Sequence, residues 1–394
     1  TFILDQIVSL ISSGHDVEIF AVKDPGEAKT HALVSEYQLL SRTSYFPRIP
    51  GNKLFRVIKG IFLFLLNFHR NPSRLLKCIH VIKFGRDALS LNLLYYNIPF
   101  LNRTFDILHC HFGQNGIIGS FIKKISPEVK LVTTFHGYDM SEFLETHGIK
   151  VYGDLFAHCD LCLPISDYWK QKLVRLGCKP EKIRVHHMGI NLEQFTFRKR
   201  QKPEPENMTV LTIGRLVEKK GHEYVIRAMA TVLTKHKNLR YIIAGNGPLR
   251  DKLKILTDEL GIQEYVEFFG ECNQTEVFEL YRQSHLFVLA SITSASGDQE
   301  GIPVVLMEAQ AVGLPVVSTI HSGIPEGVCD GKSGFLVSEK DSNALGERIL
   351  YLLENPDIWP AMGQEGRFHV EQHFDRTALN SRLEEILIGL IENR

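Results

Sequence analysis

The stretch that decides the fold is QEGIPVVLMEAQAVGLPVV, residues 299–317, in which a Gly-x-Pro turn lies between two apolar runs of strand length. The first run is HLFVLAS, residues 285–291, and the second begins at Leu314. Pro303 stands where a helix can begin, and the apolar segment after it ends at Gly313, a residue type common at helix C-termini. The order strand, loop, buried helix and strand predicts one parallel βαβ unit.

Two carboxylates eight positions apart, Glu300 and Glu308, lie in this unit. We predict Glu300 in the loop at the helix N-terminus and Glu308 about two turns along the helix, which separates them by about 12 Å. This spacing does not suit a hydrolytic acid pair, but it suits an extended ligand with a sugar at Glu300 and a ribose at Glu308. The apolar neighbours of Glu308 imply a partner for its carboxylate, because an unpaired buried charge costs several kcal/mol.

The same alternation of strand and helix recurs along both halves of the chain. In the second half, LRYIIA at 239–244 and YVEFFGE at 265–271 are each preceded or followed by a helical pattern. In the first half, FDILHCHF at 105–112 and KLVTTFHG at 130–137 follow the same rhythm. We therefore predict an α/β protein with two doubly wound parallel sheets, whose ligands bind at the carboxyl ends of strands and in the cleft between domains.

A change in composition marks the domain boundary. Residues 191–207 are polar and include Pro203, Pro205 and four Lys or Arg residues. We predict an N-terminal domain over residues 1–190, a linker over 191–207, a C-terminal domain over 208–372, and a terminal helix over 373–394 that packs back on the N-terminal domain.

The chain begins with FILDQIVSLISSG, residues 2–14, whose apolar spacing predicts an amphipathic helix. The first predicted strand, DVEIFAV, follows at residues 16–22. Because a domain of this class usually starts on a strand, we expect a first strand and its following loop to be missing from this chain. Such loops often carry ligand-binding backbone amides.

Composition argues against a disulfide-rich protein, a zinc-site protein and a membrane-spanning protein. The 394 residues have no formal net charge and an average share of apolar residues, as expected for globular domains with full cores. Seven scattered cysteines favour free thiols, and the close pair Cys159 and Cys162 lacks the second pair of a zinc site. No apolar run reaches the roughly 18 residues that span a bilayer. We expect a cytoplasmic protein that contacts the inner face of a membrane at most peripherally.

One segment departs from the neutral total. Residues 37–86 contain no Asp or Glu but ten Lys or Arg residues, and they include the apolar run GIFLFLLNF at 60–68. This pattern fits a segment that lies on an anionic membrane surface. It fits equally well a basic, solvated helical region that packs by its apolar face. Nucleic acid is not an expected partner, because no recognised binding motif accompanies the charge.

A cationic loop follows the strand that ends at Ile213. In GRLVEKKG, residues 214–221, Arg215 and Lys220 flank a strand-to-helix turn, where two cations and the positive end of the next helix converge. This arrangement predicts a diphosphate site. Lys219 and Lys220 would also suit an ordinary charged surface. The turn GNGP at 245–248 has the same kind of location and could serve only to start a helix.

His136 stands at the end of the apolar run VTTF, where open sheets place their ligand sites. A histidine there can donate to a phosphate or a sugar hydroxyl or transfer a proton, although a lone histidine is usually structural. His109 and His111 alternate on the preceding strand without a third ligand, so no metal centre is predicted. The sequence has no Gly-x-Ser-x-Gly elbow, Walker loop or His-Glu-x-x-His motif.

Taken together, these motifs resemble the retaining glycosyltransferases of family four, which have the GT-B fold of two Rossmann-like domains facing a central cleft. The matching pieces, in family order, are FHGYDMS (135–141), VHHMGINLEQF (185–195), GRLVEKKG, AGNGP (244–248), FFGE (268–271) and DQEGIPVVLMEAQAVGLPVVST (298–319). The last is similar to the family's E-x(7)-E signature. Within the family, it and FHGYDMS look most like the colanic acid type of bacterial exopolysaccharide glycosyltransferases. Asn191 departs from the family, which commonly has Asp at that turn.

The resemblance implies a set of site residues. The donor-binding residues would be Arg215, Lys220, Gly301, Ile302, Pro303, Val304 and Glu308. Among them, Arg215 and Lys220 would hold the donor diphosphate, and Glu308 would hold the ribose hydroxyls. The catalytic residues would be Glu300, in contact with the transferred sugar, and His136, which would approach that sugar from the other domain when the cleft closes.

On this resemblance we expect a retaining glycosyltransferase that moves a sugar from a nucleotide-diphosphate sugar to a saccharide or lipid-linked saccharide acceptor in cell-surface or exopolysaccharide synthesis. No metal or other cofactor is expected, because cations and the helix dipole would stabilise the leaving diphosphate. Two alternatives stay open: a non-catalytic or truncated nucleotide-sugar-binding protein of the same fold, and a GT-B epimerase or phosphorylase.

Overall fold

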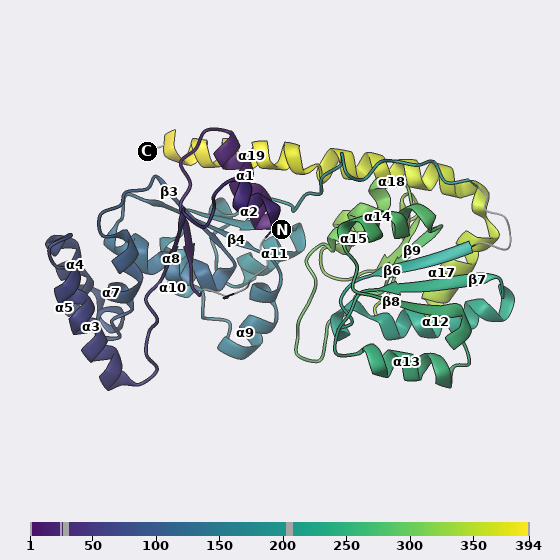
Figure 1. Ribbon diagram of the computed structural model, residues 1–394, viewed down its shortest axis with the longest axis horizontal. Coiled ribbons are helices and arrows are strands. Elements are labelled where there is room, and N and C mark those ends of the chain that lie inside the picture. Colours follow the sequence, from purple (N-terminus) through teal and green to yellow (C-terminus); the bar gives the residue numbers. More distant parts are fainter. Residues whose placement is uncertain (1, 24–25, 27–30, 202–207, 393–394) are drawn as a thin grey trace.

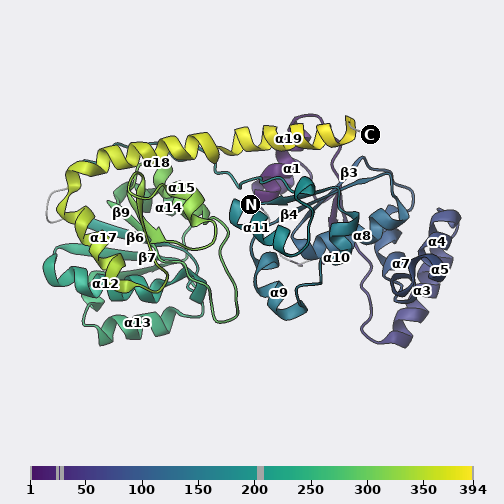
Figure 2. The ribbon, with the colours of Figure 1, turned by 180° about the vertical axis from the view of Figure 1, so that it is seen from behind.

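Short apolar strands that alternate with amphipathic helices build two α/β domains side by side, as Figure 1 shows. The computed structural model describes residues 2–23, 26, 31–201 and 208–392. Helices α18 (Trp359–His373) and α19 (Arg376–Glu392) run along the same side of both domains, and Figure 2 shows this arrangement from behind. Within these described residues, no helix combines the length and the apolar character needed to cross a membrane.

The C-terminal domain is built on a parallel six-stranded sheet with the order β11-β10-β9-β6-β7-β8. The strands are β6 (Met208–Ile213), β7 (Leu239–Ala244), β8 (Val266–Gly270), β9 (Leu286–Leu289), β10 (Val316–Thr319) and β11 (Gly334–Val337). The helices are α12 (His222–Lys235), α13 (Arg250–Glu259), α14 (Gln274–Gln283), α15 (Val304–Ala311), α16 (Ile324–Gly327) and α17 (Ser342–Glu354). Separate apolar clusters fill the two faces of the sheet, so this domain is doubly wound.

The predicted βαβ unit around residues 299–317 is confirmed. Strands β9 and β10 pair in parallel, with Phe287 opposite Val316, and α15 connects them. Gly313 has a φ of +83°, and a Cβ there would lie 2.7 Å from the carbonyl oxygen of Arg198. Only glycine fits this position, which ends the helix and returns the chain into β10.

The N-terminal domain also has parallel strands, in two separate groups. One is the three-stranded sheet of β3 (Ile107–His111), β4 (Lys130–Phe135) and β5 (Leu161–Pro164), and the other is the pair β1 (Ile19–Ala21) and β2 (Thr43–Tyr45). The main helices are α1 (Phe2–Ser12), α2 (Ala32–Glu36), α8 (Gly113–Ile125), α9 (Glu142–His147), α10 (Gly153–His158) and α11 (Asp167–Arg175). Strand β1 covers only residues 19–21 of the strand expected over 16–22, so it is shorter than predicted.

The basic segment of the sequence folds into a helical lobe, which we define as residues 53–97. It contains α3 (Lys53–Asn67), α4 (Pro72–Cys78), α5 (Val81–Phe84), α6 (Arg86–Leu89) and α7 (Asn92–Asn97). In both ribbon views the lobe occupies the end of the molecule farthest from the C-terminal domain.

Helix α19 crosses back onto the N-terminal domain. Its side chains Leu383 and Leu387 pack with Val132 and Leu163 of the N-terminal sheet. At the start of the helix, Arg376 Nη1 lies 3.0 Å from Asp5 Oδ1 on α1. The predicted terminal helix over 373–394 therefore lies in two elements, α18 up to residue 373 and α19 beyond it; residues 393 and 394 lie outside the described residues.

A buried arginine anchors the end of the predicted linker. Arg200 is 6% exposed, and its guanidinium donates to the carbonyl oxygens of Tyr281, Arg282, Ser284 and Val312 at 2.9–3.2 Å. The linker is thus bound to the C-terminal domain before β6 begins. Residues 202–207 of the predicted linker, with both of its prolines, lie outside the described residues.

Candidate functional site

Glu300 and Lys220, predicted to hold the transferred sugar and the donor diphosphate, meet directly. Glu300 lies in the loop before α15 and is 8% exposed, and the Nζ of Lys220 lies 3.1 Å from its Oε1. Lys219 pairs with Asp298 of the same loop at 2.8 Å. Burial alone would raise the pKa of Glu300, but the two lysine charges outweigh it and lower the pKa. Glu300 is therefore an anion that accepts hydrogen bonds.

A histidine and a second glutamate hold the backbone of Glu300. The backbone N–H of Glu300 donates to Nε2 of His321 at 3.1 Å, which assigns the ring proton to Nδ1. That Nδ1–H donates to Glu339 Oε1 at 2.6 Å, and the other carboxylate oxygen of Glu339 accepts from the backbone N–H of Thr293. From the other side, Ser322 Oγ donates to the carbonyl oxygen of Glu300 at 2.6 Å. The loop is therefore fixed by residues at the ends of β9, β10 and β11.

The segment from Gly301 to Val304 forms the N-terminus of α15. The backbone N–H groups of Gly301, Ile302 and Val304 donate no hydrogen bond to any residue of the described ranges. Pro303 is the N-cap residue and has no N–H. The Ile302 side chain is 7% exposed and belongs to the domain core, whereas Val304 is 39% exposed. This segment therefore presents open backbone donors at the positive end of a helix, where an anion binds readily.

Glu308 has the partner that its apolar neighbours imply. The hydroxyl of Tyr281, on α14, donates to Glu308 Oε2 at 2.9 Å and also lies 3.2 Å from the carbonyl oxygen of Val305. Burial raises the pKa of Glu308, and the hydrogen bond from Tyr281 offsets part of that rise. One carboxylate oxygen thus accepts from Tyr281, and the other accepts no hydrogen bond from the described residues.

Arg215 is exposed at the carboxyl end of β6, and its guanidinium forms no ion pair within the described ranges. Its carbonyl oxygen accepts a hydrogen bond from His222 Nε2 at 3.0 Å. The GNGP turn packs against this loop: a Cβ on Gly245 would lie 2.0 Å from the carbonyl oxygen of Gly214, and one on Gly247 would lie 2.5 Å from that of Leu216. The glycines of this turn therefore allow two backbone loops to touch.

His136 comes from the N-terminal domain, at the end of β4. Its Nε2 lies 3.2 Å from Nδ1 of His111, and its ring lies against the rings of Phe2 and Phe112, with centroid distances of 4.9 and 4.5 Å. Burial lowers the pKa of His136 to about 3, with help from the nearby His109. The ring is therefore neutral near pH 7 and can hydrogen-bond a hydroxyl, but it carries no charge for a phosphate.

A buried aspartate shapes the His136 loop. Asp139 is fully buried, and its carboxylate accepts from the backbone N–H groups of His136, Gly137 and Gly113 at 2.8–2.9 Å. These three bonds hold the turn after β4 and the start of α8 together. The hydroxyl of Tyr152 donates to the carbonyl oxygen of Asp139 at 2.7 Å and adds a further bond that holds this turn.

The His136 loop touches the Glu300 loop across the domain boundary. Gly137 has a φ of +138°, and a Cβ there would lie 3.4 Å from the backbone nitrogen of Gly301. A Cβ on Gly301 would in turn lie 2.4 Å from Ile165 Cδ1 and 2.9 Å from the carbonyl oxygen of His136. The backbone N–H of Gln299 donates to Ser141 Oγ at 3.3 Å. The structure thus brings the loop of His136 and the loop of Glu300 into contact between the domains.

Glu326 makes a second contact between the domains. It lies on α16, and its carboxylate accepts from the backbone N–H groups of Asp167 and Tyr168 at 2.8 and 3.0 Å. His187 Nε2 lies 3.2 Å from the same carboxylate. The glutamate therefore caps the N-terminus of α11, a helix of the other domain.

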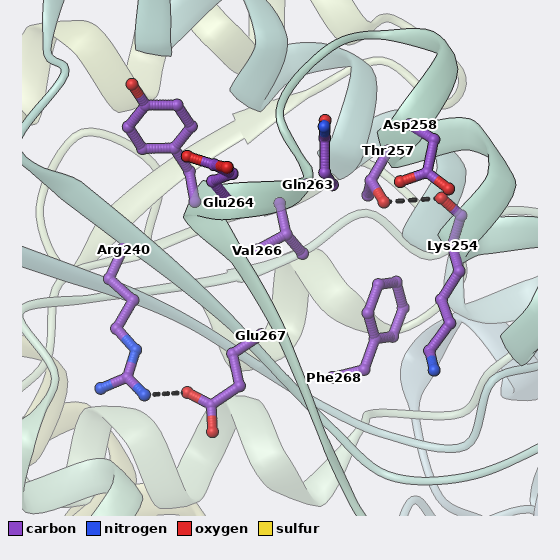
Figure 3. A pocket seen from close by; sticks show the side chains of 10 residues that line it. Arg240, Lys254, Thr257, Asp258, Gln263, Glu264, Val266, Glu267 and Phe268 are labelled. Carbon is purple, nitrogen blue, oxygen red and sulfur yellow. Dashed lines mark hydrogen bonds and ion pairs between the residues drawn. The ribbon is translucent and has the colours of Figure 1, made fainter.

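A hollow of about 510 Å³ lies at the edge strand β8, beside α13 (Figure 3). Its wall includes an ion pair between Arg240 and Glu267 and the side chains of Lys254 and Phe268. No residue predicted for the site lines this hollow. It is therefore separate from the interdomain site.

Sequence reasoning missed the residues that hold the site together. These are His111, Asp139, Tyr281, His321, Glu326 and Glu339. Asp139 lies within the FHGYDMS motif, next to two of its partners, but was not singled out there. Each of the others is a single polar residue outside the quoted family motifs, and its partner lies elsewhere in the chain. The one available sequence signal for such a residue is a set of apolar neighbours, which implies that the polar side chain is buried and has a partner. The same signal implied a partner for Glu308.

Comparison with known proteins matches nearly all of the chain to glycosyltransferases. A model described as Glycosyltransferase Family 4 matches residues 1–194, and a model described as Glycosyl transferases group 1 matches residues 193–369. The chain is 35% identical to the putative colanic acid biosynthesis glycosyltransferase WcaL of Salmonella typhimurium, over 98% of this chain and 96% of that protein. It is 36% identical to the amylovoran biosynthesis glycosyltransferase AmsK of Erwinia amylovora, over 98% of this chain and 95% of the other.

Solved structures share the fold at low identity. The structure of Anabaena Alr3699/HepE in complex with UDP and glucose aligns with a TM-score of 0.70 and 17% identity, over 98% of this chain and 95% of that one. Sucrose-phosphate synthase from Thermosynechococcus elongatus aligns with a TM-score of 0.75 and 19% identity, over 100% and 93%. The expected GT-B architecture of two Rossmann-like domains is thus confirmed, and the chain belongs to glycosyltransferase family 4, as a relative of the colanic acid and amylovoran biosynthesis glycosyltransferases.

Proposed function

We propose that this glycosyltransferase moves a sugar, with retention and without a metal, from a nucleotide-diphosphate sugar to a saccharide or lipid-linked saccharide acceptor. The observation that carries the proposal is the meeting of three features at the domain boundary. They are the Lys220–Glu300 ion pair, the open backbone donors at the start of α15, and the neutral ring of His136. Together they offer positive charge for a diphosphate and acceptors for sugar hydroxyls.

Each group then has a role that follows from its charge. Arg215, Lys220 and the N-terminus of α15 stabilise the negative charge that develops on the leaving diphosphate. Glu300 accepts hydrogen bonds from the transferred sugar, and Glu308 accepts them from the ribose through the oxygen that Tyr281 leaves free. His136 orients the sugar as a neutral hydrogen-bonding group, since its lowered pKa removes it as a cation near pH 7.

In this proposal the acceptor attacks the transferred sugar from the same face that the diphosphate leaves. The configuration at the reacting carbon is therefore retained. We propose no covalent intermediate on the enzyme. The leaving group is stabilised by fixed cations and a helix dipole, so the proposal needs no metal ion. Product stereochemistry and activity in the presence of a chelator test these two points directly.

The process and the donor are inferred from the relatives. WcaL and AmsK are named for colanic acid and amylovoran biosynthesis, which supports cell-surface polysaccharide synthesis as the process for this chain. HepE was solved with UDP and glucose, so UDP-sugars are the first donors to test. Location in the cytoplasm stays a prediction.

The test is donor binding and turnover with a panel of nucleotide sugars, measured by calorimetry and by release of the nucleotide. We expect one donor to bind and to be hydrolysed slowly without acceptor, with Glu308→Gln weakening its binding. The matched control is Glu347→Gln, which neutralises an exposed glutamate on α17. Binding without any turnover, in the presence of saccharide acceptors, would refute the enzymatic role and favour a nucleotide-sugar-binding protein.

A further inference from the structure

Helix α3 of the helical lobe has its apolar side toward solvent. Leu54, Phe55, Ile58, Ile61, Phe62 and Leu65 are each more than half exposed. Their spacing places all six on one side of a helix with 3.6 residues per turn. We call this set the apolar stripe.

The inward side of α3 is the more polar one. Gly60 and Asn67 are buried against the domain. Arg56 and Lys59 are half-buried, and they donate to the carbonyl oxygens of Pro50 and Arg48 at 3.0 and 2.8 Å. Leu63 and Phe64 of the same helix also pack inward, against the apolar core of the lobe. The alternative prediction of packing by an apolar face thus holds for these two residues, and the six residues of the apolar stripe lie outside that contact.

The helical lobe that carries the apolar stripe is also rich in cations that form no ion pair with a described residue. Of the ten Lys and Arg residues in 37–86, only Arg42 forms an ion pair within the described ranges, with Asp16. Lys53, Lys77, Lys83 and Arg86 are exposed. The surface therefore combines apolar side chains with positive charge that no protein carboxylate neutralises.

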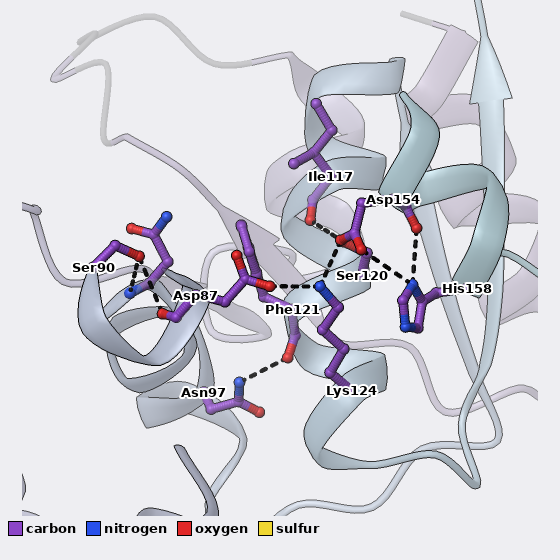
Figure 4. Close-up of polar contacts among 10 residues, drawn as sticks. Asp87, Ser90, Asn97, Ile117, Ser120, Phe121, Lys124, Asp154 and His158 are labelled. Atoms are coloured by element: carbon purple, nitrogen blue, oxygen red, sulfur yellow. Dashed lines mark hydrogen bonds and ion pairs between the residues drawn. The ribbon is translucent and has the colours of Figure 1, made fainter. Parts of the chain in front are cut away.

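The acid that ends this segment faces the domain core instead. Asp87 accepts from Lys124 of α8 at 2.6 Å, and the same lysine contacts Asp154 of α10 at 2.7 Å (Figure 4). The amide of Asn97 donates to the carbonyl oxygen of Phe121 at 3.1 Å. The ion pair of Asp87 with Lys124 and the buried hydrogen bond of Asn97 fix the lobe to the N-terminal domain, so the orientation of α3 is part of the fold.

We propose that the outer face of the helical lobe docks on the surface of an anionic lipid bilayer. The apolar stripe enters the boundary between headgroups and acyl chains, and the lysines and arginines of the lobe contact lipid phosphates. A face without carboxylates suits an anionic surface, whereas a second copy of this chain would bring two positive faces together. The lobe lies at the end of the molecule away from the C-terminal domain, so docking there leaves the interdomain site open.

Lipid binding is measured without donor or acceptor, which separates this proposal from the proposed function. The probes are vesicles of phosphatidylcholine and vesicles of equal parts phosphatidylcholine and phosphatidylglycerol, used in co-sedimentation. We expect the protein to bind the anionic vesicles and to be released by salt. The variant Lys53→Gln/Lys77→Gln/Lys83→Gln should weaken binding roughly 100-fold, at about fivefold per charge.

The apolar contribution has its own variant. Ile61→Gln/Phe62→Gln should weaken binding at least about tenfold and should do so at every salt concentration. Unchanged donor binding and circular dichroism show that the variant is folded.

Matched controls lie on the C-terminal domain. Ile255→Gln/Phe368→Gln replaces two apolar side chains of similar exposure, 57% and 58%, against 56% and 62% for Ile61 and Phe62. Lys235→Gln/Lys237→Gln/Lys252→Gln removes the same charge from exposed positions. Both controls should bind vesicles like the unaltered protein.

Three results would overturn the proposal. They are no binding of the unaltered protein to anionic vesicles, equal losses in the lobe variants and in the controls, and a dimer in analytical ultracentrifugation that Ile61→Gln/Phe62→Gln dissociates while lipid binding is absent. The last result would assign the apolar stripe to a second copy of the chain.

Discussion

His186 predicts a clear dependence of stability on pH. It is 2% exposed, and neither ring nitrogen has a hydrogen-bond partner within the described part of the chain. Burial, together with the nearby His187, Arg382 and Arg184, lowers its pKa to about 4. The folded protein therefore keeps this ring neutral under conditions in which the unfolded chain protonates it.

The size of the effect follows from the two pKa values. With a pKa of about 6.5 in the unfolded chain, this histidine destabilises the fold as the pH falls below 6.5, because the unfolded state binds the extra proton. At about pH 5 the difference amounts to roughly 1.5 pH units, or about 2 kcal/mol at ~1.36 kcal/mol per unit. An unpaired polar group in the core costs a further ~1–3 kcal/mol at any pH.

The perturbation is His186→Leu, which replaces the ring by an apolar side chain. We expect the variant to be more stable than the unaltered protein by about 1–3 kcal/mol near pH 7.5 and by about 2 kcal/mol more near pH 5. Urea unfolding followed by circular dichroism at both pH values measures this. The same pH dependence in both proteins would refute the reasoning, since it would show that His186 finds a partner or water in solution.

Three further predictions concern the site. Glu308→Ala should weaken donor binding by about 10- to 100-fold in calorimetry, because hydrogen bonds to a charged group contribute about 1.5–3 kcal/mol. His136→Ala should chiefly lower kcat. Equal losses of donor binding in the two variants would contradict these roles. His321→Ala should lower kcat about tenfold with little change in KM, because the Glu300 loop loses the hydrogen bond that holds its backbone. Glu339→Gln should have a smaller effect in the same steady-state assay. A fall in thermal stability without a change in kcat would assign the pair a purely structural role. Glu326→Gln should lower Tm by a few degrees, for a loss of about 1 kcal/mol, because it weakens the cap that joins the domains; an unchanged melting curve would show that the contact contributes nothing.

Local patterns were sufficient for the βαβ unit and the donor-site motifs. The alternation of apolar runs with Gly313 and Pro303 predicts β9, α15 and β10, because strand and helix periods and turn residues are properties of neighbouring positions. Position at the carboxyl end of a strand was enough to select Arg215 and His136 as candidates, since parallel sheets place their ligand sites there.

The contacts within the site depend on packing between distant elements. Lys220 reaches Glu300 from another loop, and His321 reaches the backbone of Glu300 from beyond β10, so no spacing rule connects them. The charge states follow from the same packing, because burial and partners set a pKa.

The amino-acid sequence by itself determined the fold class, the order of the elements and the positive charge of residues 37–86, all of which follow from composition and short-range periodicity. Only the tertiary structure decided which side of α3 faces water and which carboxylate pairs with which cation. A helical pattern shows that two faces exist, but which one is buried depends on the surface that the rest of the domain presents to it. The ion pair between Lys220 and Glu300 likewise exists only because two strands of one sheet bring their loops to the same edge.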